Sequence, residues 1–190
     1  MKRILASLII VGNTWVGAWG PSSLVVLGTC ALGQAQSNDV SVSVWIAETG
    51  TEFLDIIQIG AMTFPDGRIR YFAAWGNGVP MTVGSSYAQV DLGPATRGAH
   101  VYRLSLANRI WSLYIDNKEV YRVSDNFRHW RLRKSQAMAE AEGSGDTLGG
   151  SLTAPTWCNV ADGWQVGGWG RLNSSTYRIT TKGWKAWRNG

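Results

Sequence analysis

The chain has 190 residues, 45% of them hydrophobic and 16% charged, which suits one globular domain and excludes a disordered tail. The formal charge is +5, but the eighteen Lys and Arg residues are scattered apart from the run at 128–134, so no nucleic-acid partner is expected. Twenty-three glycines separate short apolar segments, a pattern typical of an all-β chain with many turns.

The first 35 residues allow two interpretations. In "MKRILASLIIVG" two cations precede an apolar run of signal-peptide length, and small residues at 16–18 and 33–35 offer cleavage sites. We therefore favour a secreted protein with a signal peptide within 1–35 and a single domain over 36–190. The alternative is that residues 13–33 are the first strands of that domain. The apolar stretch 22–33 is too short to span a bilayer, and Cys30 and Cys158 could pair if both remain.

Residues 39–48 begin a series of predicted strands. They alternate, so that Val44 and Ile46 share one face while Ser43 and Trp45 share the other. The segments 53–64 and 68–75 flank "PDG" at 65–67, a turn sequence that predicts a hairpin. Glu48, Glu52 and Asp55 lie near a turn, and we expect them to be ordinary surface carboxylates.

Four further strands are expected over residues 86–93, 100–108, 109–116 and 119–125. Trp111, Leu113 and Ile115 share one face, and the turn residues Asp116 and Asn117 tolerate the positive φ of a tight hairpin. The stretch 130–145 has helical propensity, but its alternation favours a strand. The alanines at 137, 139 and 141 would face one way, and Gln136, Met138, Glu140 and Glu142 the other.

These strands predict a β-sandwich with two packed apolar faces and one outer face left for ligands. Gln58 is the single amide in the apolar run "DIIQIGAMTF", and an amide there is costly to bury without hydrogen-bond partners. Its place is explained if its strand forms the bottom of a groove, on the outer face that also carries the row from Gln136 to Glu142.

Three segments carry a resemblance to a known family: "SVSVWIAETGTEFLDIIQIGAMT", the aromatic strand "RYFAAW", and "SQAMAEAEG". Together they resemble the eqolisins, the glutamic peptidases, over roughly residues 40–142. The resemblance implies a concanavalin A-like jelly roll of two antiparallel sheets. It also implies an endopeptidase in which Gln58 and Glu140 are the catalytic dyad and Trp45 walls the site.

The chemistry of such a dyad sets a geometric requirement. A carboxylate deprotonates a water that attacks the peptide carbonyl, while a carboxamide holds the water and stabilises the oxyanion. We therefore predict that Gln58 and Glu140 lie on the same face of one sheet, close enough for one water to bridge them. Trp75, Met138 and Glu142 are the further residues expected to bind a polypeptide substrate.

A non-catalytic carbohydrate-binding module is the main alternative, because flat indole faces stack on sugar rings. Trp45, Trp75 and Trp130 would then be the platforms for a glycan. No cofactor is implied, and His100 and His129 have no cysteine or carboxylate at ligand spacing, so no metal site is expected. The sequence contains neither a glycine-rich phosphate loop nor a Gly-x-Ser-x-Gly elbow.

Overall fold

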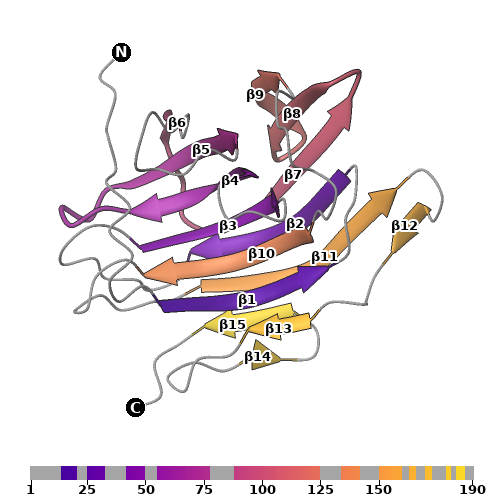
Figure 1. Ribbon diagram of the computed structural model, residues 1–190. Coiled ribbons are helices and arrows are strands. Elements are labelled where there is room, and N and C mark those ends of the chain that lie inside the picture. The colour runs from indigo at the N-terminus through magenta and orange to yellow at the C-terminus, as the bar shows by residue number, and fades with distance from the viewer. Residues whose placement is uncertain are drawn as a thin grey trace.

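The computed structural model describes residues 14–20, 25–32, 42–49, 55–77, 88–124, 134–141, 150–159, 163–165, 170–172, 179–180 and 183–186. The regular elements in these ranges are all β-strands, and their pairings are antiparallel. They form two sheets, which confirms the predicted jelly-roll sandwich (Figure 1). Within the described ranges, no helix is long and apolar enough to cross a membrane.

The seven-stranded sheet has the order β13-β1-β10-β3-β4-β5-β6. Its strands are β1 (Thr14–Gly20), β3 (Val42–Thr49), β4 (Asp55–Thr63), β5 (Ile69–Asn77), β6 (Ala88–Pro94), β10 (Lys134–Ala141) and β13 (Gly170–Leu172). Strand β10 therefore lies between β1 and β3, two strands that are distant from it in the sequence.

The eight-stranded sheet has the order β14-β15-β11-β2-β7-β8-β9, with β12 paired to β11 beside this path. Its strands are β2 (Val25–Leu32), β7 (Ala99–Ala107), β8 (Ile110–Ile115), β9 (Lys118–Ser124), β11 (Gly150–Asn159), β12 (Gly163–Gln165), β14 (Ile179–Thr180) and β15 (Gly183–Ala186). Because β2 has neighbours on both sides, it is an interior strand of this sheet.

The hydrophobic core lies between the two sheets. Val44 and Ile46 of β3 are fully buried there and belong to one cluster with Leu104 of β7 and Trp111 and Leu113 of β8. The alternation in the sequence predicted the inward face of β3 and of β8 correctly.

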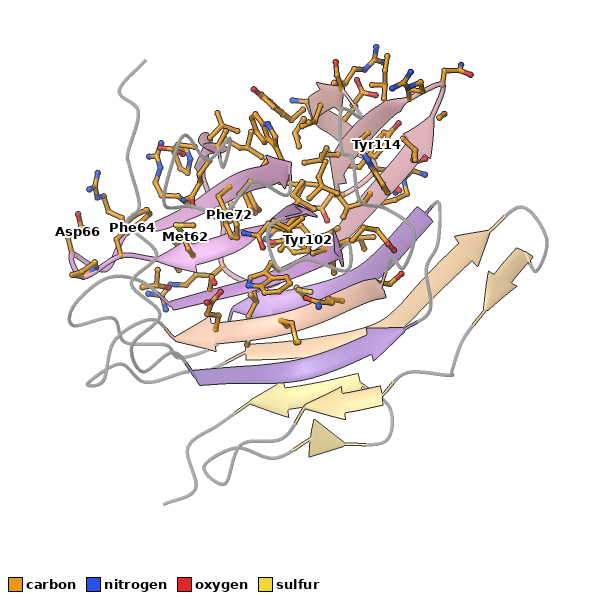
Figure 2. The ribbon with its side chains drawn as sticks, in the orientation of Figure 1. Met62, Phe64, Asp66, Phe72, Tyr102 and Tyr114 are labelled. Atoms are coloured by element: carbon orange, nitrogen blue, oxygen red, sulfur yellow. The ribbon has the colours of Figure 1, made fainter. Side chains whose placement is uncertain are left out.

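The hairpin turns follow the predicted chemistry. Between β4 and β5 the N–H of Gly67, at φ 78°, donates to the carbonyl of Phe64, and Asp66 accepts from the N–H of Arg68 (Figure 2). Asp116 and Asn117 have φ of 50° and 66° between β8 and β9. Both turns therefore confirm the hairpins expected from "PDG" and from Asp116-Asn117.

Within the first 35 residues the structure describes strands β1 and β2, and the signal peptide stays a prediction. Strands β1 and β2 take part in the two sheets, as the alternative interpretation of that segment expects. Cys30 on β2 is a buried free thiol. Cys158 pairs with Val25 in register, whereas Cys30 pairs with Leu152. Cα atoms five residues apart along a strand are about 16 Å apart, too far for a disulfide.

Glu48 corrects the expectation of a surface carboxylate. Its side chain is fully buried on the core face of β3, where the hydroxyl of Ser135 on β10 donates to its Oε1. The two residues are also Cα partners in the β3–β10 ladder. Glu48 was predicted to be at the surface because a turn follows it in the sequence. The last residues of β3 before that turn nevertheless keep the alternation, which places Glu48 on the core face.

A polar cluster joins the two sheets at one edge of the core. The hydroxyl of Tyr71, on β5, lies 3.0 Å from Nε2 of His100 on β7, and Nδ1 of His100 lies 2.7 Å from Oδ2 of Asp116. The N–H of Val101 donates to the other oxygen of Asp116 at 2.9 Å. Burial would raise the pKa of Asp116, but the bonds from His100 and Val101 lower it below its ordinary value.

We expect this cluster to contribute to acid unfolding. A carboxyl whose pKa is lowered by folding stabilises the native state above its unfolded pKa, about 3.9, and this contribution is lost as the pH falls through the lower folded pKa. Asp116→Asn, which keeps a residue that tolerates positive φ, should lower stability at pH 7 and flatten the decline below pH 4. Urea unfolding midpoints from pH 2 to 7 test this; parallel curves for the two proteins would contradict it.

Gly60 on β4 makes a second stability prediction. A Cβ there would collide with the carbonyl oxygen of Val44 and lie 2.7 Å from Cβ of Trp45. Gly60→Ala should therefore destabilise the fold by about 3 kcal/mol, the upper range for overpacking. Gly67→Asn is the control, since Gly67 has open space around it and Asn tolerates its positive φ. Equal unfolding midpoints for the two variants would refute the close approach.

Candidate functional site

The outer face of the seven-stranded sheet carries four of the predicted site residues, Trp45, Gln58, Met138 and Glu140. We call this face, over β10, β3, β4 and β5, the floor. Its residues form three rungs of Cα partners across the four strands: Gln136–Ala47–Gln58–Ala74, then Met138–Trp45–Gly60–Phe72, then Glu140–Ser43–Met62–Arg70. Each rung is two residues from the next, so all twelve positions share one face.

Apolar side chains occupy the middle of the floor. Trp45, Met62, Phe72 and Met138 are each less than a tenth exposed and form a second buried cluster with Ala47 and Ala74. The seven-stranded sheet is therefore packed on both faces. The polar floor residues Gln58, Gln136 and Glu140 stand around this apolar centre, at the first and third rungs.

Gln58 is nearly buried, with 8% of its surface exposed. It is the Cα partner of Ala47 on one side and of Ala74 on the other, and both alanines are fully buried. These small neighbours leave room above them for the longer carboxamide. The prediction that Gln58 belongs to the outer face of its sheet is confirmed.

Glu140 is half-buried and is oriented by an aromatic neighbour. The indole Nε1–H of Trp45 donates to Oε2 of Glu140 over 3.3 Å. Ser43, 4% exposed, is the Cα partner of Glu140 on β3. Alternation predicted that Ser43 shares a face with Trp45, but no role in the site was predicted for Ser43. Its position two residues before Trp45 on the same face was the feature that could have indicated one.

Gln58 and Glu140 share a sheet and a face, as predicted, and bridging by one water stays a prediction. They lie on strands separated by β3 and are four residues out of register, since Gln58 is level with Ala47 and Glu140 with Ser43. Ordinary strand spacings then place their Cα atoms roughly 16 Å apart. Trp45 stands midway between them on β3, with its indole N–H directed to Glu140.

The residue level with Gln58 on β10 is Gln136. Both are Cα partners of Ala47, and two strand spacings put their Cα atoms about 10 Å apart. Alternation predicted that Gln136 belongs to the outer row, and no role in the site was assigned to it. Alternation shows which face of the sheet a residue lies on, but it does not show which residue of the next strand it pairs with. The alignment of Gln136 with Gln58 could therefore not be predicted.

The remaining predicted residues divide between the two faces. Met138 lies on the floor beside Trp45. Trp75 does not, because it is the Cα partner of Ile57, packs against the core cluster and stacks on Tyr121 with ring centroids 5.4 Å apart. Its assignment to the groove is therefore corrected. Glu142 and Trp130 lie outside the described residues, as does the basic run before Lys134.

The tryptophans with described side chains offer no exposed platform for a sugar. Trp45 is 5% exposed, Trp111 is fully buried, and Trp75 is half-buried against the core. No group of three or more potential metal ligands occurs among the residues that the structure describes. The polar groups on the described floor are therefore one carboxylate, two carboxamides, a hydroxyl, an indole N–H and the guanidinium of Arg70.

Comparison with known proteins gives similarity in structure alone. No family model matches the chain, and no curated protein matches it significantly. Scytalido-glutamic peptidase, solved with a peptide-based transition-state analogue, superposes with TM-score 0.57 at 13% identity, over 92% of this chain and 96% of that one. SCP-B, an eqolisin solved with the tripeptide Ala-Ile-His, gives 0.58 at 13% identity, over 91% and 96%.

A family 16 glycoside hydrolase from Bacteroides ovatus, solved with an oligosaccharide product, superposes less well, with TM-score 0.46 at 8% identity over 68% of each chain. The two glutamic peptidases, at TM-scores of 0.57 and 0.58, share the fold of this chain. The resemblance carried by the sequence motifs is confirmed for the fold: the chain has a jelly roll of two antiparallel sheets, like that of these two peptidases.

Proposed function

We propose that the floor binds an extended polypeptide and that Glu140 is the general base of a glutamic-type endopeptidase. The observation that carries this proposal is the hydrogen bond from Trp45 Nε1 to Glu140. This hydrogen bond holds the half-buried carboxylate of Glu140 on the same sheet face as the carboxamides of Gln58 and Gln136, beside the apolar cluster of the floor. The fold shared with two glutamic peptidases supports the substrate class. Export, which the first twelve residues favour, is part of the proposal.

The reaction at Glu140 needs no dyad with Gln58. The carboxylate accepts a proton from a water, whose oxygen forms a bond to the peptide carbonyl carbon. The indole N–H of Trp45 keeps Glu140 in place, and the hydroxyl of Ser43 is the neighbouring donor for the oxyanion. The protonated Glu140 then gives its proton to the leaving nitrogen as the C–N bond breaks. Gln58, at the other end of the floor, is left to bind the backbone of the substrate.

A specific observation favours a second function, binding of polypeptide without hydrolysis. The residue of β10 that is level with Gln58 is Gln136, and an amide cannot take a proton from water. If the peptide bond of a bound polypeptide lies between these two carboxamides, the site binds the polypeptide and does not hydrolyse it. A glycan remains the alternative ligand, although the described tryptophans do not favour it.

The first test is cleavage of a denatured protein from pH 2 to 7. Glu140→Gln should abolish cleavage, because general-base catalysis contributes about 10²- to 10⁴-fold. Trp45→Phe keeps the ring but removes the N–H that positions Glu140, and it should reduce kcat by about 10²-fold. Glu119→Gln, on the exposed end of the other sheet, is the matched control. Full activity of Glu140→Gln, or inactive wild-type protein, would refute hydrolysis at Glu140.

A gain-of-function variant separates the two candidates. Gln136→Glu places a carboxylate level with Gln58 without changing the size of the side chain. If the chain only binds polypeptide, wild-type protein is inactive, and this variant should acquire acid-dependent cleavage that a further Gln58→Ala removes. If Glu140 is the base, wild-type protein cleaves and Gln136→Glu changes its rate by less than the loss in Glu140→Gln. Product mapping by mass spectrometry distinguishes the outcomes.

A further inference from the structure

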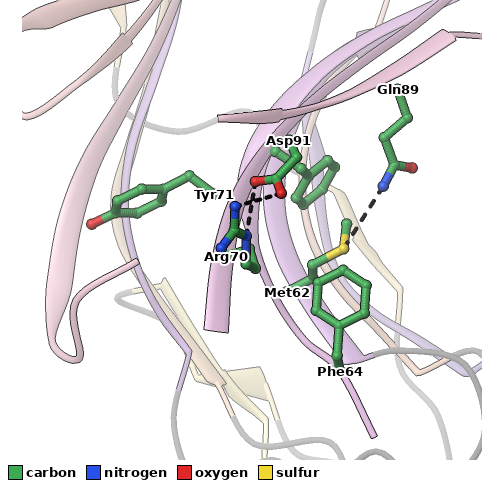
Figure 3. A pocket seen from close by; sticks show the side chains of 7 residues that line it. Met62, Phe64, Arg70, Tyr71, Gln89 and Asp91 are labelled. Atoms are coloured by element: carbon green, nitrogen blue, oxygen red, sulfur yellow. Dashed lines mark hydrogen bonds and ion pairs between the residues drawn. The ribbon is translucent and has the colours of Figure 1, made fainter. Parts of the chain in front are cut away.

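A small pocket opens on the floor at the side of β5 and β6. Met62, Phe64 and Phe72 form its apolar wall, while Arg70, Gln89 and Asp91 stand at its polar rim (Figure 3). Its volume is about 40 Å³. None of the proposed catalytic groups lines it, so the pocket is separate from the carboxylate of Glu140.

The register fixes the distance from the pocket to Glu140. Met62 and Arg70 lie on the third rung, the rung of Glu140, with Ser43 between Glu140 and Met62. Two strand spacings separate Met62 from Glu140, about 10 Å. An extended chain that crosses the strands advances about 3.3 Å per residue. The pocket lies between Met62 and the strands beyond it, so it meets a substrate side chain about three to four residues from a bond held at Glu140.

The polar rim is internally neutralised. Arg70 and Asp91 form a two-bond ion pair, with Nε–Oδ1 at 2.9 Å and Nη2–Oδ2 at 2.6 Å, and the amide of Gln89 donates to Sδ of Met62 at 3.7 Å. Burial would raise the pKa of Asp91, but the bonds from Arg70 and from the N–H of Gly93 lower it. Because the two charges of the pair offset one another, the rim does not favour a charged occupant.

We propose that this pocket is a specificity subsite for a leucine or methionine side chain of the bound polypeptide; this rests on the proposed function. A volume of about 40 Å³ corresponds to roughly three water-sized positions, room for a chain of three or four heavy atoms and too little for an indole. The apolar wall and the sulfur of Met62 match an unbranched or γ-branched aliphatic group, whose burial is favourable.

The test measures binding separately from cleavage. Full-length Glu140→Gln protein is titrated, by fluorescence anisotropy, with extended labelled peptides that carry Leu, Met, Ala or Trp at one scanned position. At the position that meets the pocket, Leu and Met should bind about tenfold or more tightly than Ala and than Trp, as expected for a small apolar pocket. The other positions should show smaller differences.

Two variants of opposite effect identify the pocket. Gln89→Phe, added to Glu140→Gln, fills the pocket and should remove the preference for Leu over Ala. Phe64→Ala enlarges the pocket and should shift the preference toward Trp. Ile110→Phe, which adds an aromatic ring at an exposed site of β8, is the control and should change nothing. Circular dichroism checks the fold of each variant; if Phe64→Ala fails to fold, Gln89→Phe alone decides.

The outcomes separate the subsite from the function on which it rests. Peptide binding with no side-chain preference, or with a preference that Gln89→Phe leaves unchanged, overturns the subsite and leaves polypeptide binding intact. If no peptide binds Glu140→Gln or wild-type protein, both the subsite and the proposed function are overturned. A preference for Leu that disappears in Gln89→Phe and persists in Ile110→Phe supports both.

Discussion

The close approach of β3 and β4 at Gly60 is the constraint on which the site depends. Trp45 and Gly60 are Cα partners, and any side chain at position 60 would collide with the backbone of Val44. The large indole of Trp45 is accommodated because its partner, Gly60, has no side chain, and this requires the observed register. Once it is set, Gln58 is level with Ala47 and Met62 with Ser43. The glycine of the Gln-x-Gly motif therefore positions the glutamine two residues before it.

The seven-stranded sheet is buried on both faces, and this shapes what the floor can do. Its inner face supplies Val44, Ile46, Ile57 and Ile59 to the core, and its outer face supplies Trp45, Met62, Phe72 and Met138 to a second cluster. Polar groups set into such an apolar bed are poorly solvated, and their interactions with one another are stronger than in water. The hydrogen bond between Trp45 and Glu140 benefits from these surroundings.

Local patterns predicted faces and turns well because both depend on neighbouring residues. The alternation of Val44, Trp45 and Ile46, and the positive φ at Asp116 and Asn117, required no distant contact. Trp75 was placed wrongly because an aromatic residue suits either face of a sheet that is packed on both. Glu48 was placed wrongly because its buried partner, Ser135, is 87 residues away.

Register was the part of the site that the sequence could not supply. A slip of one residue exchanges the faces of a strand, but a slip of two or four keeps them. The row of alternating alanines in β10 is compatible with any even slip, so alternation alone allows Gln136, Met138 or Glu140 to be level with Gln58. The distinction decides whether Gln58 faces an amide or a carboxylate.

Two side-chain hydrogen bonds hold β10 in its observed register, one on each face. On the core face the hydroxyl of Ser135 donates to the buried Glu48, its own Cα partner. On the floor the indole of Trp45 donates to Glu140. An even slip that kept every alanine in the core would still separate Ser135 from Glu48 and leave polar groups buried without these bonds, which is costly. Buried polar pairs of this kind specify one alignment among several that apolar packing tolerates. The core carboxylate that the sequence placed at the surface thus determines which side chain faces Gln58.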